Sequence, residues 1–128
     1  MPTQSEKHLY EYAVIRFMPR VEREEFVNVG LIMMCKRRRW IKVEIHFDES
    51  KIKALFPGAD CGDISRQLES FRQVASGANS YAAAMEAHEQ FRWLTAVRSA
   101  CITTSRPHPG ITSDLDSTFN RLFTELIL

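Results

Sequence analysis

The segment from Phe26 to Phe47 constrains the fold most, because it joins two different strand patterns through a short basic run. Phe26–Cys35 is almost continuously apolar, which is typical of a central strand; we expect its odd-numbered residues on one covered face and its even-numbered residues on the other. Trp40–Phe47 instead alternates, so its odd-numbered residues are expected to point inward. Because Lys36–Arg39 separates the two patterns by a loop-sized gap, we predict an antiparallel hairpin.

A further strand is predicted before this hairpin. Tyr10–Phe17 is rich in aromatic and β-branched residues, and its alternation places Arg16 on the less apolar face, near the strand end. Pro19 has no amide proton to donate, so we expect the strand to stop there. The mixed-charge connector Arg20–Glu25 then leads into the hairpin. The first three strands are therefore predicted to form an antiparallel meander.

Two helices are expected directly after the meander. Asp48 or Ser50 can cap a short helix that ends at Phe56, before a Pro-Gly pair. Asp63 is the expected N-cap of a second helix, which runs to about residue 76 and carries apolar residues at helical spacing.

The last third of the chain mixes helix, strand and turn signals. The Ala-rich segment Tyr81–His88 predicts a helix, and Ala100–Ser105 a fourth strand. Pro107–Gly110 holds two prolines and a glycine, which predicts an irregular turn. Ser113 or Asp114 is then expected to cap a final helix with an apolar stripe.

These elements predict a single domain over residues 1–128, with 1–8 as a frayed leader. The fold class is α+β: an antiparallel sheet of three to four strands, with helices packed mainly on one face. A chain of 128 residues is long enough to build one real core.

Charge and composition exclude several classes of function. A formal net charge of +1 gives no polyanion-binding arm, so we expect no nucleic-acid partner. The three cysteines contain no Cys-x-x-Cys pair and the histidines lack ligand spacing, so we expect no metal and no cofactor. No apolar run is long enough to cross a bilayer. A cytoplasmic location with reduced thiols is therefore expected.

One polar group stands out beside the predicted turn between the first two strands. Arg16 and Asn28 would share a face if these strands pair, and with Glu25 they form a candidate ligand-binding site. Arginine offers a fork of donors to a carboxylate or phosphate, and asparagine offers one donor and one acceptor. The structural alternative is that Arg16 pairs with a neighbouring glutamate, that Asn28 ties the connector down and that Gly30 marks a bulge or close contact.

A second candidate group lies in the C-terminal half. Arg92, Arg98 and His108 would extend the first group into an anion site if the fold brings them together. His108 could also transfer a proton near neutral pH. The alternative is that these are separate surface residues. Lys36–Arg39 likewise either contacts phosphate, with Trp40 available for stacking, or is a solvated hairpin loop.

Two segments resemble a known bacterial family. The first is Tyr12–Pro19 followed by Glu25–Gly30, and the second is Phe91–Thr95 followed by Arg98-Ser99, Ser105 and His108–Gly110. Together they resemble the family catalogued as domain of unknown function 3037, over nearly the whole chain. The resemblance implies no activity. Members of that family often lie beside genes for kinases that resemble the HipA toxin, which implies an operon partner of that kind.

The sequence therefore leaves two functions open. The preferred one is a non-catalytic accessory or interaction protein, with a partner that is encoded nearby. The alternative is a binder or enzyme for a phosphorylated or carboxylated small ligand, held by an arginine-lined site. Whether the chain has any catalytic activity stays open, since no phosphate-binding or acyl-transfer motif occurs in it.

Overall fold

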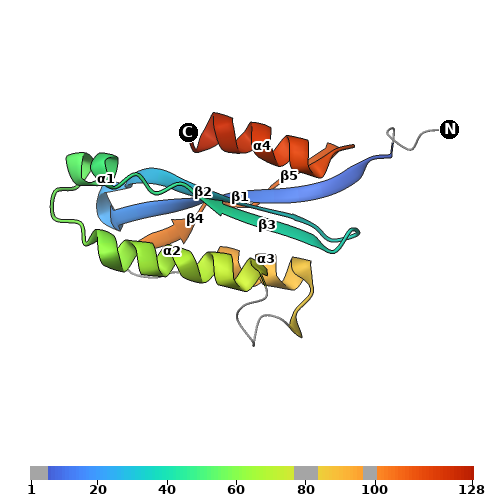
Figure 1. Ribbon diagram of the computed structural model, residues 1–128, viewed down its shortest axis with the longest axis horizontal. Coiled ribbons are helices and arrows are strands. Elements are labelled where there is room, and N and C mark those ends of the chain that lie inside the picture. The colour runs from blue at the N-terminus through green and yellow to red at the C-terminus, as the bar shows by residue number, and fades with distance from the viewer. Residues whose placement is uncertain (1–5, 77–83, 97–100) are drawn as a thin grey trace.

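The computed structural model describes residues 6–76, 84–96 and 101–128, and within these it shows a five-stranded antiparallel sheet with four α-helices (Figure 1). The strands are β1 (His8–Arg20), β2 (Glu25–Cys35), β3 (Trp40–Ile45), β4 (Ile102–Thr104) and β5 (His108–Thr112). The helices are α1 (Glu49–Leu55), α2 (Cys61–Ser76), α3 (Ala87–Ala96) and α4 (Leu115–Leu126), and the 3-10 turn η1 (Val21–Arg23) lies between β1 and β2. The predicted α+β fold is confirmed.

Strand β1 is the centre of the sheet. It pairs with β2 along one edge, and β2 pairs in turn with β3, so the predicted meander and hairpin are confirmed. The other edge of β1 is shared by two short strands. The segment Ile15–Phe17 pairs with β4, and His8–Tyr12 pairs with β5. One long strand therefore links two ends of the molecule that carry different neighbours.

Helices cover both faces of the sheet, most of them on one side (Figure 1). The larger apolar cluster joins α1, α2 and α3 to the face that carries Ala13, Ile15 and Phe17. Helix α4 packs on the opposite face, where Phe119 and Leu122 contact a smaller cluster with Leu31 and Met33. None of the helices in the described ranges has the length and apolar character needed to cross a bilayer.

A bulge in β2 overturns part of the predicted face assignment. Ile15 pairs with Gly30 and Arg16 with Asn28, which leaves Val29 as an extra residue. The alternation changes phase there, so Val29 lies with the larger cluster while Leu31 and Met33 face α4. Gly30 allows this close packing, because a Cβ at that position would lie 2.9 Å from the carbonyl oxygen of Glu44.

The two predictions based on proline were wrong. β1 continues past Pro19 to Arg20, because Pro19 falls in a register irregularity where a regular ladder bond is not required. The segment predicted as an irregular turn mostly forms β5, where Pro109 sits opposite Glu11 on an outer strand. Gly110 leaves room for the ring of Tyr10 across the pair.

The helix ends follow local capping chemistry. Asp48 caps α1 by accepting from the Lys51 amide at 3.1 Å, and Asp114 caps α4 by accepting from the Ser117 amide at 3.1 Å. Each was one of the two caps predicted for its helix. In α2, Asp60 accepts from the amide of Asp63, so the predicted cap was three residues late. Part of the helix predicted over 81–88 lies outside the described residues, and α3 begins only at Ala87.

Candidate functional site

The structure brings two of the predicted ligand-binding residues together. Arg16 and Asn28 are register partners on β1 and β2, on the face that α4 covers. The Arg16 guanidinium carbon lies 4.1 Å from the centre of the Phe26 ring, a cation–π contact. The Asn28 amide nitrogen donates to the Leu126 carbonyl at 3.0 Å and holds the end of α4 on the sheet. Asn28 therefore has a structural role of its own.

Each of these two side chains buries a polar atom that has no partner. The Nε of Arg16 is a donor and the Oδ1 of Asn28 is an acceptor, and neither is hydrogen-bonded. Buried polar atoms are normally paired with protein or water, because desolvation without a bond costs about 1–3 kcal/mol. A water molecule, or a ligand that offers both an acceptor and a donor, would satisfy the pair.

The other predicted residues lie elsewhere. Glu25 forms an ion pair with Arg23. Arg92 is exposed on α3, which covers the opposite face of the sheet from Arg16. His108 lies on β5 with its ring 5.2 Å from that of Tyr12, four residues along β1 from Arg16. Arg98 lies outside the described residues. A ligand-binding role for these residues stays a prediction.

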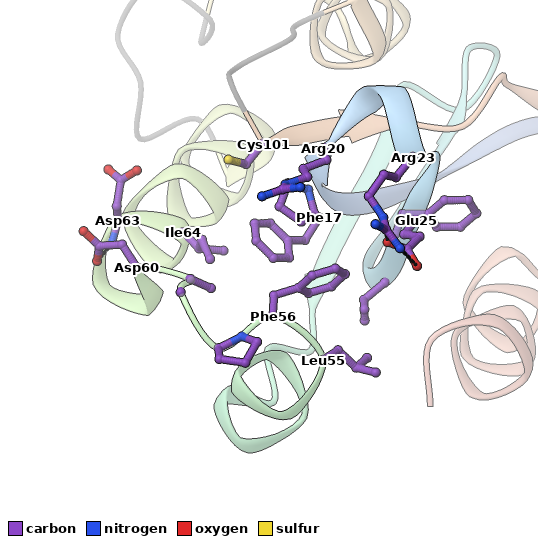
Figure 2. A pocket seen from close by; sticks show the side chains of 16 residues that line it. Phe17, Arg20, Arg23, Glu25, Leu55, Phe56, Asp60, Asp63, Ile64 and Cys101 are labelled. Carbon is purple, nitrogen blue, oxygen red and sulfur yellow. Dashed lines mark hydrogen bonds and ion pairs between the residues drawn. The ribbon is translucent and has the colours of Figure 1, made fainter.

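A hollow lies at the end of the sheet, where β1 turns into β2. We call it the end groove; it has a volume of about 700 Å³ and faces the α1–α2 connection (Figure 2). The residues that line it are Phe17, Pro19, Arg20, Arg23, Glu25, Phe26, Val27, Leu55, Phe56, Pro57, Gly58, Ala59, Asp60, Asp63, Ile64 and Cys101.

The floor of the end groove is aromatic and continuous with the core. The rings of Phe17 and Phe56 meet edge to face with their centres 5.5 Å apart, at the middle of the groove in Figure 2. Phe17 is 1% exposed and belongs to the larger core cluster. At the rim, Leu55 is 56% exposed and Phe26 is 42% exposed. An apolar surface thus runs from the core out to solvent.

The charged groups of the rim mostly satisfy one another. Arg23 Nε lies 2.6 Å from Glu25 Oε1; this hydrogen bond, with the charge of Arg23, holds the pKa of Glu25 below its ordinary value. On the facing wall Asp63 contacts Arg66 at 3.5 Å. The side chain of Arg20 makes no hydrogen bond or ion pair with the described residues, and its charge acts on Glu25 only at longer range. Arg20 is therefore available to an acidic group of a bound molecule.

This arrangement fits binding better than catalysis. An apolar floor with one available cation can hold an apolar group beside a carboxylate. Sequence reasoning missed the end groove, because its floor combines Phe17 with Phe56 and its facing wall includes Asp60, and only the fold joins these three. The one local signal was the Pro57-Gly58 pair, which predicted the bend of the facing wall.

A third group has the residue types of a metal site. Ligand atoms of Glu86, His88 and Glu89 lie within 4.8 Å of one another. Their contacts explain this closeness, since Glu89 accepts from the Glu86 amide at 3.0 Å at the start of α3 and Glu86 lies 3.7 Å from Arg39. The group is accounted for as a helix start with an exposed ion pair.

Comparisons with known proteins give one match. The model of a family described as "Protein of unknown function (DUF3037)" matches residues 12–127. No curated protein and no solved structure matches the chain.

Proposed function

Because the chain belongs to the family of unknown function DUF3037, whose description names no activity, we propose from the candidate sites that it is a non-catalytic accessory protein of the bacterial cytoplasm that binds a partner protein. The end groove is the proposed binding surface. Its occupant is an apolar segment of the partner, with an acidic residue placed to pair with Arg20. A HipA-like kinase encoded beside the gene is the first candidate partner, since the sequence resemblance implies such a neighbour.

The exposed apolar rim is the observation that carries this proposal. Leu55 and Phe26 expose large apolar side chains next to a floor that is already part of the core. Protein interfaces commonly combine such a well-packed apolar centre with a polar rim. The side chains of the floor are held before binding, which lowers the entropy that association must overcome.

The polar groups support a binding role over a catalytic one. Glu25 is ion-paired with Arg23, and because this contact lowers the pKa of its carboxyl, the carboxylate is a weaker general base than an unpaired one. His108 lies toward the other end of β1, beside Tyr12. Glu25 and His108 are therefore far from each other along the sheet, since Glu25 pairs with Arg20 and His108 with Tyr12.

Co-expression with the products of neighbouring genes, followed by size-exclusion chromatography, tests this proposal. We expect a stable complex that is lost in Leu55→Asp and in Phe26→Asp, because each places a charge on the apolar rim. Leu128→Asp is the matched control, since Leu128 is also exposed but lies outside the end groove. A complex that survives both rim variants would contradict the proposal, as would the absence of a complex with any neighbour.

The two unpaired atoms of Arg16 and Asn28 favour a second candidate function, a binder of a small carboxylate or phosphate. The anion would accept from the Arg16 guanidinium, and a hydroxyl or amide of the same ligand would donate to Asn28 Oδ1. The Phe26 ring beneath the guanidinium fixes the plane in which the anion would bind. Phe26 is shared with the rim of the end groove, whereas Arg16 and Asn28 are not among the residues that line the groove.

A thermal-shift screen against organic acids, phosphosugars and nucleotides tests the second function. A ligand at about 100 times its dissociation constant stabilises the fold by roughly 2.7 kcal/mol, a rise of several degrees in a domain of this size. We expect that rise to vanish in Arg16→Ala and to persist in Arg92→Ala. A screen without a hit would contradict this function, and so would a shift that is unchanged in Arg16→Ala.

A further inference from the structure

A second hollow lies at the opposite end of β1 from the end groove. We call it the basic hollow; it has a volume of about 660 Å³ and is lined by Lys7, Leu9, Lys36, Arg37, Arg39, Glu86 and Ile111. In Figure 1 this end carries the tip of the β2–β3 hairpin and the start of β1. Arg16 and Asn28, which form the small-ligand candidate site, are not among the residues that line the basic hollow.

The floor of the basic hollow is an exposed aliphatic pair. Leu9 on β1 and Ile111 on β5 are direct register partners, and each is 66% exposed. Large apolar side chains scattered singly on a surface are ordinary, but two that are joined across a strand pair form a contiguous patch. On the other edge of β1, Glu11 pairs with Met34 near the end of β2, and the basic loop begins two residues later at Lys36.

The wall of the basic hollow carries more positive charge than its surroundings neutralise. Arg39 lies 3.7 Å from Glu86, but Lys7, Lys36 and Arg37 form no ion pair with the described residues. The loop is a tight turn, closed by a 3.1 Å hydrogen bond from the Arg39 amide to the Lys36 carbonyl. Since the whole chain has a formal net charge of only +1, this end is a local concentration of cations.

These properties favour an acidic protein segment over the other polyanions. None of the described residues that line the hollow is an aromatic on which a single-stranded nucleic acid could stack, and Trp40 packs against Phe119 under α4. Binding to a bilayer relies on a broad apolar face, whereas Leu9 and Ile111 are the two apolar residues among the seven that line the hollow. A segment with carboxylates on both sides of an apolar residue matches both the floor and the wall.

We propose that the basic hollow is a docking site for an acidic segment of a partner protein, with an apolar side chain seated on Leu9 and Ile111 and its carboxylates on Lys36 and Arg37. This surface is separate from the end groove. The proposal therefore does not depend on the proposed function.

Fluorescence anisotropy tests the site. The probe is a labelled peptide in which glutamates flank a pair of leucines. We expect binding that weakens as salt rises. A twin with serines in place of the leucines should bind on the order of tenfold more weakly. A lysine-for-glutamate twin should not bind. Equal binding of the serine twin would overturn the role of the aliphatic pair, and no binding of the glutamate peptide would overturn the proposal.

Matched charge variants locate the binding. Lys36→Glu combined with Arg37→Glu should abolish binding of the glutamate peptide. Lys51→Glu combined with Arg106→Glu changes the net charge by the same amount outside the hollow, and this control should keep most of the binding. Equal losses in the two double variants would show a general charge effect and overturn the assignment. Vesicles of phosphatidylserine and phosphatidylcholine, or a short single-stranded DNA, should compete poorly with the peptide for the basic hollow. If the protein binds the vesicles or the DNA instead of the peptide, the proposal is overturned.

Discussion

The end groove and the basic hollow lie at opposite ends of the same strand and expose apolar side chains in different settings. The floor of the end groove is continuous with the core through Phe17, and most charges on its rim are already paired. The floor of the basic hollow is a surface pair, Leu9 and Ile111, beside cations that are mostly unpaired. Binding at the groove should therefore follow shape and apolar contact, and binding at the hollow should follow charge and salt.

The largest difference between the two ends should appear in stability. Phe17→Ala removes a side chain that is 1% exposed, and it should lower the free energy of unfolding by about 3–5 kcal/mol. Leu9→Ala removes one that is 66% exposed, and it should change that free energy by less than about 0.5 kcal/mol. Urea unfolding of both variants measures this contrast. Equal costs would mean that the groove floor is not part of the core.

A pair of glycine substitutions sharpens the comparison. Gly110 lies under the Tyr10 ring, so the Cβ of Gly110→Ala would meet ring atoms and should cost about 1–3 kcal/mol. Gly58, on the wall of the end groove, has no atom within 4 Å of an added Cβ. Gly58→Ala should stay within about 0.5 kcal/mol of the wild type. Thermal or urea unfolding would contradict this packing if Gly58→Ala proved the more costly change.

The smallest predicted effect concerns Glu25 at the rim of the end groove. Its pKa lies below the ordinary value because of the hydrogen bond from Arg23, so its contribution to stability is present above the unfolded pKa and is lost as pH falls through the lowered one. An NMR titration of the Glu25 carboxyl carbon should give this lowered midpoint, and Arg23→Gln should return it toward the ordinary value. An unchanged midpoint in Arg23→Gln would remove Arg23 as the cause.

The sequence predicted those parts of the fold that follow local periodicity. Trp40–Phe47 alternates regularly and forms β3, which ends two residues earlier than predicted, at Ile45, and the last helix packs the apolar stripe that its spacing predicted. Local patterns failed where tertiary pairing decides. The bulge at Val29 reverses the faces of Leu31 and Met33, and no composition signal marks an extra residue in so apolar a run.

The candidate sites were less predictable than the fold. The pairing of Arg16 with Asn28 followed from the expected meander, because register partners share a face. The end groove did not, since Phe17 and Phe56 are brought together only by packing between the sheet and the α1–α2 connection. The basic loop was visible in the sequence, but Ile111 joined it only through β5, in a segment where prolines argued against a strand.

Hydrogen exchange of the protein, alone and in complex with its co-expressed partner, tests the central claim most directly. The claim is that the end groove holds the partner. We predict slower amide exchange in the complex over Glu25–Val27 and over Leu55–Asp60, the two sides of the groove. A stable complex in which neither segment gains protection would contradict that claim.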